Sequence, residues 1–497
     1  MPGRETRPSG AAARGGARAS IIDIGAYVPR LRLDRQRIGD AWGMAMGTGE
    51  KAVANWDEDS ITMGIEAGLD CLGARDTSAV DMCVLATTTA PYLEKQSATV
   101  VATALDLGRR VRTADVTGTL RAGTTALQIA QDAIAAGSAR QALVTVADDR
   151  LARPQSLLEN SFGDAAAAFL LGPAGSDGAI AEIEWSGSVH NETVEYWRNP
   201  GDRFVAEWED RFIRQAGYLP VMSEAITSAL EDADLKPADF DTVVVYPLDA
   251  KSARGLVRDL GFEDQVLADD LGTKVGNCGA AQVPLEVVSV LETAAPGQRI
   301  LVAGYGDGAD VLVLRVTDAI RRWKRRRGVA GHVASSRQLA NYAAYIGTKQ
   351  LMETEAASRR LEYASPPQMR RDRASVLGRY GQRCRACQTV QFPFQRVCAV
   401  CSAKDDFEAQ RVAAKGVLFT FTIDILMPSP VPPTIMGIVD LEDGARMFIP
   451  VTDIGVEEAK LGLPLELCVR KLHDAQGIHH YYWKARPSRD EDPKEPQ

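Results

Sequence analysis

The strongest constraint on the fold is a unit that occurs twice in the 497-residue sequence. Two almost entirely apolar helical stretches begin at Gly123 and Gly279, and a strand pattern follows each after a similar interval, at Gln141 and Arg299. A helix without a polar face is expected to be buried on every side. Because this repeat is much longer than the ~20–50 residues of a solenoid unit, it indicates an internal duplication.

Local patterns between residues 19 and 316 favour a layered α/β fold. Short apolar strand patterns alternate there with helical ones, which is typical of that class. The helix expected at 60–72 has Asp57 or Ser60 as its N-terminal cap. The other elements expected in the first half of this region are strands at 19–27 and 81–89 and a helix at 97–108.

Composition excludes several classes of protein. Hydrophobic residues make up 45% and charged residues 25%, which excludes a wholly disordered chain. No apolar run approaches the ~20 residues of a membrane span, and a net charge of −9 argues against a general nucleic-acid surface. Residues 1–18 lack the apolar core of a secretory signal and predict a disordered tail. We expect a soluble, cytoplasmic protein with neither membrane nor nucleic-acid partners.

The character of the chain changes after Val316. The stretch RRWKRRR at 321–327 places six basic residues around Trp323. Charge runs of this kind are typical of a solvated linker or helix face, and the alternative is a contact with an anionic ligand or an acidic partner. Residues 335–375 are polar and helical in composition, with a break expected at the Pro-Pro pair 366–367.

Four cysteines have the spacing of a metal site. Cys384 and Cys387 form one CxxC pair, and Cys398 and Cys401 form a second after ten intervening residues. Two such pairs fill the four positions of a tetrahedral ion and leave none for a catalytic water. The pattern predicts a structural Zn²⁺ in a rubredoxin-like ribbon. The alternative, a redox-active pair, lacks the βαβ setting that it needs.

Beyond the cysteines the chain is rich in short strands separated by glycine turns, which predicts a small β-barrel. The clearest patterns are the strand at 416–426 and the hairpin at 434–454, turned at EDGA. Cys468 lies in a strand pattern and is expected in the core. His479 and His480 bring too few ligands for a second metal site.

The C-terminal third resembles the zinc-ribbon/OB-fold family that occurs beside thiolase-like enzymes of acyl-CoA metabolism. The motifs that carry the resemblance are GVLFTFTI, DGARMFIPVTD, LGLPLEL and YYWKARP. The resemblance implies a module that binds acyl-CoA or a partner protein rather than nucleic acid.

The N-terminal part resembles hydroxymethylglutaryl-CoA synthase of the thiolase superfamily. The motifs are IGAYVPRLRL, NWDEDSITMGIEAGLDCL, DVTGTLRAGTTALQIA, FGDAAAAFLLG, WEDRF and GNCGAAQ. The resemblance implies a duplicated five-layer α-β-α-β-α thiolase-like domain. The predicted organisation is a tail at 1–18, the thiolase-like domain at 19–320, a basic linker with helices at 321–380, the ribbon at 381–405, the OB-fold at 406–487 and a disordered tail at 488–497.

The same resemblance implies that the catalytic residues have been replaced. The family's cysteine nucleophile aligns with Leu120, its glutamate acid/base with Thr88 and its histidine with Tyr246, whereas the asparagine of the GN turn remains as Asn277. Leucine cannot form a thioester, and threonine is no general base at neutral pH. We therefore expect no synthase reaction from this domain.

One cysteine offers an alternative nucleophile. Cys278 follows Asn277 at the start of the second buried helix, and related thiolases bring a second cysteine to the site from a comparable loop. The competing interpretation is a small buried core residue, as also expected for Cys71 and Cys83.

These observations favour a degenerate, accessory component of an acyl-CoA-processing complex. Its partner would be a cysteine-bearing thiolase-like subunit in a hetero-oligomer, its substrate a CoA thioester, and its reaction a Claisen acyl transfer or retro-aldol cleavage. Two alternatives stay open. One is a self-sufficient acyltransferase or synthase that uses Cys278 or an unaligned group. The other is a non-catalytic binding or regulatory module, including one that binds nucleic acid by stacking bases on barrel aromatics such as Phe419 and Tyr481. Whether the chain is itself an enzyme is left undecided.

Overall fold

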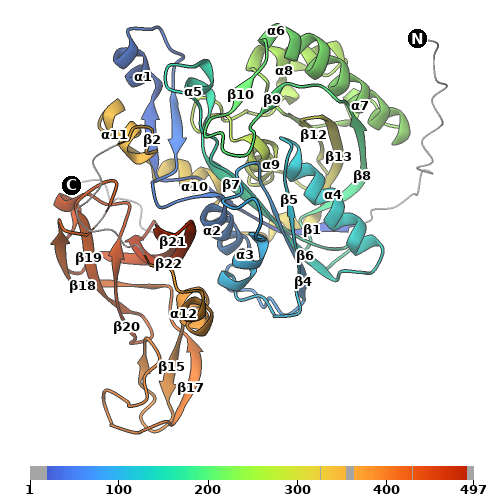
Figure 1. Cartoon of the computed structure of the whole chain (residues 1–497). Coiled ribbons are helices and arrows are strands. Elements are labelled where there is room, and N and C mark those ends of the chain that lie inside the picture. Colours follow the sequence, from blue (N-terminus) through green and yellow to red (C-terminus); the bar gives the residue numbers. More distant parts are fainter. Residues whose placement is uncertain (1–18, 325, 354–362, 428, 490–497) are drawn as a thin grey trace, which may run out of the picture.

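The computed structural model describes residues 19–324, 326–353, 363–427 and 429–489 (Figure 1). The tail predicted at 1–18 and nearly all of the one predicted at 488–497 lie outside this part. Within it, a large α/β body is followed by a ribbon and a β-barrel that packs against one side of the body. No described helix has the length and apolar character needed to cross a bilayer.

The duplication is confirmed in the sheet topology. The first half contributes the order β5-β4-β6-β7-β1 and the second β11-β12-β13-β8, and a short pairing of β1 with β8 joins them into nine strands. An isolated bridge between Val243 and Leu267 stands where the second half would have its equivalent of β5. The strands are β1 (Ala19–Tyr27), β4 (Val80–Ala86), β5 (Arg112–Val116), β6 (Gln141–Asp148), β7 (Ala165–Pro173), β8 (Ala181–His190), β11 (Thr242–Val245), β12 (Arg299–Tyr305) and β13 (Gly308–Val316).

Helices cover both faces of the two half-sheets and complete the predicted five-layer thiolase-like fold. Two helices pack between the halves, two cover the outer face of the first half, and two lie on the outer side of the second. In that order they are α4 (Ala122–Ala135) and α9 (Gln282–Leu291), α2 (Ser60–Leu72) and α3 (Ala98–Ala104), and α7 (Leu219–Asp232) and α8 (Ala250–Asp259).

The two central helices differ in burial. Nearly all of α9 is buried, as predicted. The prediction that α4 is buried on every side is wrong, because Ile129 is 41% exposed and one face of α4 opens to solvent. The helices touch where Gly123 faces α9: a Cβ there would lie 2.7 Å from the carbonyl oxygen of Ala280.

The predicted cap of α2 is also wrong. The cap is Asp59, whose carboxylate accepts the N–H of Thr62 at 2.9 Å, while the Thr62 hydroxyl accepts the N–H of Asp59 in return. This reciprocal pair is a capping box. Asp57 does not cap α2 and instead binds Lys484 of the barrel.

The segment after residue 316 folds back onto the α/β body. Trp323 Nε1 donates to the buried carboxylate of Asp23 at 2.8 Å, and Arg326 pairs with the same group at 2.9 Å. Arg327 binds Glu466 of the barrel at 2.8 Å. These members of the basic stretch therefore bind carboxylates of the chain itself.

Short helices and strands complete the α/β body and the segment that links it to the ribbon. The Pro-Pro pair begins a helix instead of breaking one, because proline is tolerated in the first helical turn. The elements are β2 (Leu31–Asp34), α1 (Arg35–Trp42), β3 (Glu50–Val53), α5 (Leu157–Ser161), β9 (Tyr196–Trp197), β10 (Ala206–Glu207), α6 (Asp210–Phe212), α10 (Gly328–Ala334), β14 (Arg337–Gln338), α11 (Tyr342–Thr348), α12 (Pro366–Arg371) and α13 (Arg373–Val376).

The C-terminal part contains the predicted ribbon strands and a closed barrel of OB type. The barrel order is β18-β19-β20-β22-β21. The ribbon strands are β15 (Tyr380–Cys384), β16 (Val390–Gln391) and β17 (Phe407–Arg411), and those of the barrel are β18 (Lys415–Asp424), β19 (Thr434–Leu441), β20 (Arg446–Val451), β21 (Pro464–Ala475) and β22 (Ile478–Pro487).

A buried ion network joins the barrel to the α/β body. Arg470 of β21 is fully buried and pairs with Glu58 at 3.0 Å and with Asp453 at 2.9 Å. Lys484 of β22 binds Asp57 at 2.8 Å. Since buried charges are tolerated only when they are paired, these contacts hold the barrel in one orientation on the body.

Arg486 extends the same network. It pairs with Glu66 of α2 at 2.6 Å and with Glu466 of β21 at 2.7 Å. The neighbouring guanidinium of Arg486 is the main reason that the pKa of the buried Glu466 falls to about 2, against the effect of burial. Glu466 is therefore charged at neutral pH.

We predict that Arg470→Ala lowers the free energy of unfolding by about 3 kcal/mol, because it leaves buried carboxylates unpaired. The control is Arg258→Ala, which removes an exposed ion pair with Asp264 and should cost far less, because solvent screens such a pair. Urea unfolding of both variants measures the difference. Equal losses would show that the network contributes nothing specific to stability.

Candidate functional site

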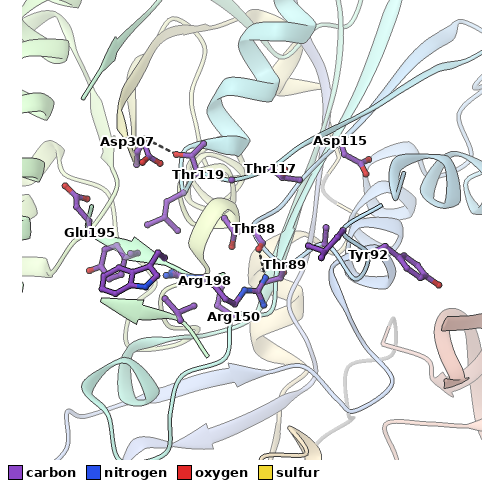
Figure 2. Close-up of a pocket in the computed structure, with 18 of the residues that line it drawn as sticks. Thr88, Thr89, Tyr92, Asp115, Thr117, Thr119, Arg150, Glu195, Arg198 and Asp307 are labelled. Atoms are coloured by element: carbon purple, nitrogen blue, oxygen red, sulfur yellow. Dashed lines mark hydrogen bonds between the residues drawn. The ribbon is translucent and has the colours of Figure 1, made fainter. Parts of the chain in front are cut away.

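A cavity of about 560 Å³ opens at the N-terminal end of α4, where the two halves of the α/β body meet (Figure 2). Most of its lining comes from four segments: the loop after β4, the turn before α4, the stretch around β9 and the turn between β12 and β13. Asp115, Arg150 and Val205 complete the lining. Ligand sites in α/β proteins are typically found where loops converge in this way.

Leu120 lines the cavity directly before α4. The turn at Gly306 lies against it: a Cβ on residue 306 would lie 2.8 Å from the backbone nitrogen of Leu120. The first N–H groups of a helix lack partners within the helix and carry partial positive charge. The end of α4 can therefore stabilise negative charge on a ligand, but the Leu120 side chain offers no nucleophile.

Thr88 also lines the cavity, and its polar groups are already used. Its hydroxyl and its N–H both donate to the buried Asp148, at 2.8 and 2.6 Å. Asp148 also accepts the N–H of Ala280 at 2.8 Å. Thr88 therefore ties the loop after β4 to the start of the second central helix.

Tyr246 and Asn277 are brought together behind the cavity. The Asn277 amide donates to the Tyr246 hydroxyl at 3.0 Å. The Tyr218 hydroxyl donates to the Tyr246 carbonyl at 2.8 Å, and burial raises the pKa of the Tyr246 phenol. Neither Tyr246 nor Asn277 is among the residues that line the cavity. Of the four positions aligned with the family's catalytic residues, Leu120 and Thr88 lie on the cavity wall. Tyr246 and Asn277 lie behind it.

Cys278 is fully buried and is not part of the cavity lining. Its thiol donates to the Gly276 carbonyl at 3.4 Å, and burial raises the pKa of the thiol well above its usual range. A nucleophilic cysteine requires the thiolate form, which this environment disfavours. Cys71, Cys83 and Cys468 are buried as well, as expected for core residues.

Glu195 is a titratable residue of the cavity that no sequence motif indicated. It is 7% exposed, and the Tyr305 hydroxyl donates to its carboxylate. Burial raises the pKa of Glu195 to about 7, and the Tyr305 hydrogen bond offsets only part of this effect. Gly217 leaves room for the carboxylate, because a Cβ there would overlap it. A carboxyl group with this pKa can exchange protons at neutral pH.

Two arginines add positive charge to the same cavity. Arg150 follows the carboxyl end of β6, is 4% exposed and lies over the Phe162 ring at 4.1 Å. Arg198 donates to the Thr88 carbonyl at 2.8 Å. The position of Arg150 is a signal that the sequence does contain, since side chains at the carboxyl ends of strands gather around ligands in α/β sheets.

The four ribbon cysteines converge as predicted. Cys384 and Cys401 sulfurs are 3.6 Å apart, as are those of Cys387 and Cys398, and all four lie within 4.8 Å of one another. These separations suit a tetrahedral metal ion with metal–sulfur distances of ~2.3 Å. The contact with Thr389 is the main cause that lowers the pKa of Cys387 to about 6, which favours the thiolate that a metal needs. The cluster can hold a metal ion.

We predict one metal ion per chain, measured by elemental analysis of the purified protein. Cys398→Ser should lose the ion and melt at least several degrees lower, because metal binding to such a site contributes directly to folding. Cys468→Ser, which changes a cysteine outside the cluster, is the control and should keep the ion. A metal-free wild-type protein that is folded would contradict the assignment.

Comparison with known proteins agrees with this fold. The family described as "ChsH2, C-terminal OB-fold domain" matches residues 409–470. The family of 3-oxoacyl-[acyl-carrier-protein] synthase III matches residues 114–188, and its C-terminal counterpart matches 230–315. The matches fall on the barrel and on the two halves of the α/β body.

Solved structures share the α/β fold at low identity. MvaS in complex with 3-hydroxy-3-methylglutaryl coenzyme A has a TM-score of 0.61 at 21% identity and covers 70% of this chain and 95% of its own. 3-Oxoacyl-(acyl carrier protein) synthase III from Pseudomonas aeruginosa has a TM-score of 0.55 at 19% identity, with 60% and 98% covered.

Relatives found by sequence have a higher identity to this chain than these solved structures do. Hydroxymethylglutaryl-CoA synthase of Pyrococcus furiosus is 32% identical over 331 residues, which are 65% of this chain and 94% of the relative. The Aeropyrum pernix enzyme is 34% identical over 317 residues, which are 62% of this chain and 87% of the relative. The chain therefore belongs to the hydroxymethylglutaryl-CoA synthase family of thiolase-type proteins and carries a C-terminal OB-fold domain of the ChsH2 type.

Proposed function

We propose that the chain binds a CoA thioester in the cavity without becoming acylated, as one component of a complex that makes or breaks a C–C bond beside the thioester. A thiolase-like partner with an active cysteine carries out the covalent step. The observation that carries this proposal is Leu120: the cavity remains open at the end of α4, but a leucine stands at the family's nucleophile position.

The size and charge of the cavity support a CoA thioester as its ligand. A volume of about 560 Å³ lies within the usual range of small-molecule sites. Arg150 and Arg198 supply positive charge for an anionic ligand, and Lys95 is a third cation of the lining. The sequence relatives are named as enzymes of a CoA thioester.

The end of α4 supports a role in C–C bond chemistry without a nucleophile. Claisen and retro-aldol steps both place negative charge on the thioester oxygen, as an oxyanion or an enolate. Fixed N–H donors stabilise such charge without any covalent bond to the protein. The start of α4, with the positive end of the helix dipole, lies next to Leu120 on the cavity wall.

Exposed apolar side chains on the barrel support a protein partner. Phe419 of β18 is 51% exposed and Phe448 of β20 is 65% exposed, while Ile425 and Leu426 beyond β18 are 75% and 66% exposed. Large apolar side chains exposed to this extent are available to a protein partner, and we assign these residues of the barrel to contact with the thiolase-like subunit.

We further propose that the metal of the ribbon is Zn²⁺ with a structural role. Four cysteine ligands suit zinc and leave no open coordination position for a substrate or water. The same choice agrees with a cytoplasmic location, because none of the eight cysteines forms a disulfide and a reducing compartment keeps thiols unpaired.

A second candidate function is C–C bond cleavage by this chain alone. Its specific support is Glu195, whose pKa of about 7 and place on the cavity lining suit a general base. Retro-aldol cleavage of a 3-hydroxyacyl thioester needs such a base and an enolate stabiliser, and no nucleophile. This route has better geometric support than one through the buried Cys278.

We predict that wild-type protein incubated with radiolabelled acetyl-CoA carries no label after denaturation. Leu120→Cys should become labelled, because the end of α4 lowers the pKa of a thiol placed there. Leu127→Cys, which lies further along α4, is the control and should remain unlabelled. Labelled wild-type protein, with the acyl group on Cys278, would contradict the proposal.

The second candidate predicts that the purified chain releases a carbonyl product from 3-hydroxyacyl-CoA thioesters. The rate should rise with pH around 7, as Glu195 loses its proton, and Glu195→Gln should lower it by ~100-fold or more. Glu192→Gln, an exposed neighbour, should leave the rate unchanged. No release by wild type at any pH would exclude this second function and leave the first in place.

A further inference from the structure

Tyr92 connects the cavity to the barrel. It lies in the loop after β4 and lines the cavity, while its hydroxyl accepts the backbone N–H of His479 at 2.8 Å (Figure 2). The Tyr92 and His479 rings are 4.8 Å apart. One residue of the cavity wall is thus in direct contact with β22, although the two are far apart in the sequence.

The barrel presents His479 on a rigid hairpin. Strands β21 and β22 are joined by Gln476 and Gly477, with φ values of 52° and 74°. Two consecutive residues with positive φ are typical of the tightest two-residue hairpin turns. The carboxylate of Asp474 then binds His479 Nδ1 at 2.5 Å across the turn, so the ring is held on the side that faces Tyr92.

The hairpin is itself anchored on the α/β body. Two residues after His479, the Tyr481 hydroxyl donates to Asp59, the cap of α2, at 2.7 Å. The buried pairs of Arg470 lie further along the same strands. The hairpin therefore cannot shift relative to the body without breaking buried polar contacts.

Among the described residues, the hydrogen bonds between the α/β body and the loop that carries Tyr92 lie near the two ends of the loop. Thr88 is bound to Asp148 at one end, and Gln96 donates to the Thr113 carbonyl at the other. Between them the loop extends into solvent, since Leu93 is 86% exposed. The contact with His479 supports the loop at its middle.

We propose that the barrel hairpin supports the wall of this chain's own cavity, with Tyr92 as the positioning residue that makes acyl-CoA binding depend on the docked barrel. This inference rests on the proposed function, in which an acyl-CoA occupies the cavity. It gives the OB-fold domain a role inside the chain, in addition to contact with a partner. The acyl-CoA is then recognised by the body and the barrel together.

The test is equilibrium binding of acetoacetyl-CoA to the full chain, measured by calorimetry for wild type, Tyr92→Ala, His479→Ala and the double variant. Tyr92→Ala removes both the hydrogen bond to the backbone N–H of His479 and the ring contact, and should weaken binding about tenfold. His479→Ala removes only the ring contact and should weaken binding less. The double variant should be little weaker than Tyr92→Ala alone, because Tyr92→Ala already removes the ring contact that His479→Ala removes.

His480→Ala is the matched control. His480 is the next residue of β22, and its ring stacks on His473 at 4.3 Å instead of on Tyr92. The His480→Ala variant should therefore bind acetoacetyl-CoA with the affinity of the wild type. Tyr92→Phe keeps the ring and loses only the hydroxyl, so it should recover part of the affinity lost in Tyr92→Ala. It also keeps the test valid if Tyr92→Ala fails to fold.

Three outcomes would overturn the inference or its basis. If Tyr92→Ala weakens binding but neither Tyr92→Phe, which loses the hydrogen bond to the hairpin, nor His479→Ala, which loses the ring contact, does so, Tyr92 acts directly on the ligand and the barrel plays no part. If the two losses add fully, the residues act independently and the inference is again wrong. If wild type itself binds no CoA thioester, the proposed function fails, and the inference falls with it.

Discussion

Arg470 holds the two parts of the chain in a single arrangement. Its guanidinium is completely buried and meets carboxylates from both sides of the interface, Glu58 of the α/β body and Asp453 of the barrel. A buried charge in this position requires all of its partners. The orientation of the barrel, and with it the place of every residue on β21 and β22, depends on this network.

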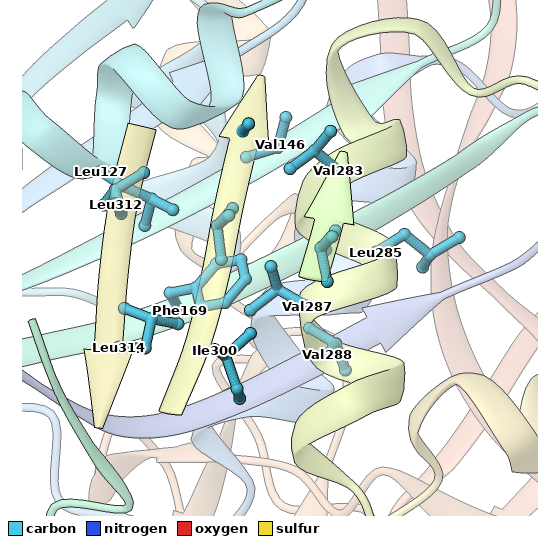
Figure 3. Close-up of a cluster of buried hydrophobic side chains, with 14 of the residues drawn as sticks. Leu127, Val146, Phe169, Val283, Leu285, Val287, Val288, Ile300, Leu312 and Leu314 are labelled. Carbon is cyan, nitrogen blue, oxygen red and sulfur yellow. The ribbon is translucent and has the colours of Figure 1, made fainter. Parts of the chain in front are cut away.

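The cavity depends on a second constraint, the close approach of the two central helices. Gly123 allows α4 to reach the backbone of the second repeat, and apolar side chains of α9 such as Val283 and Leu285 share one core with Val146 and Phe169 of the sheet (Figure 3). This core fixes the start of α4 beside the turn at Gly306. The cavity can therefore stay open at the start of α4 with Leu120 on its wall.

The sequence predicted the features that recur or follow a fixed spacing. The duplicated unit, the four cysteines and the barrel strands are local patterns, and the structure contains each of them. The features that it could not predict arise from contacts between distant residues. Asp59 rather than Asp57 caps α2, and Asp57 instead binds Lys484, more than four hundred positions away.

The functional site also combines residues that the sequence located with residues that only the structure reveals. Leu120 and Thr88 could be placed by resemblance, and both lie on the cavity wall. Glu195 and Tyr92 carry no motif: one acquires its raised pKa from burial beside Tyr305, and the other is placed by the docked barrel. No local pattern can report properties that only the assembled fold creates.

The central claim is that this chain contributes an acyl-CoA cavity but no covalent nucleophile to a two-component reaction. Its most direct test is acyl-CoA turnover by this chain, by a cysteine-bearing thiolase-like subunit co-expressed with it, and by the two together. The account predicts C–C bond formation or cleavage only with both chains present, and an acyl group on the cysteine of the thiolase-like subunit. Full turnover by the thiolase-like subunit alone, or an acyl group on this chain, would contradict it.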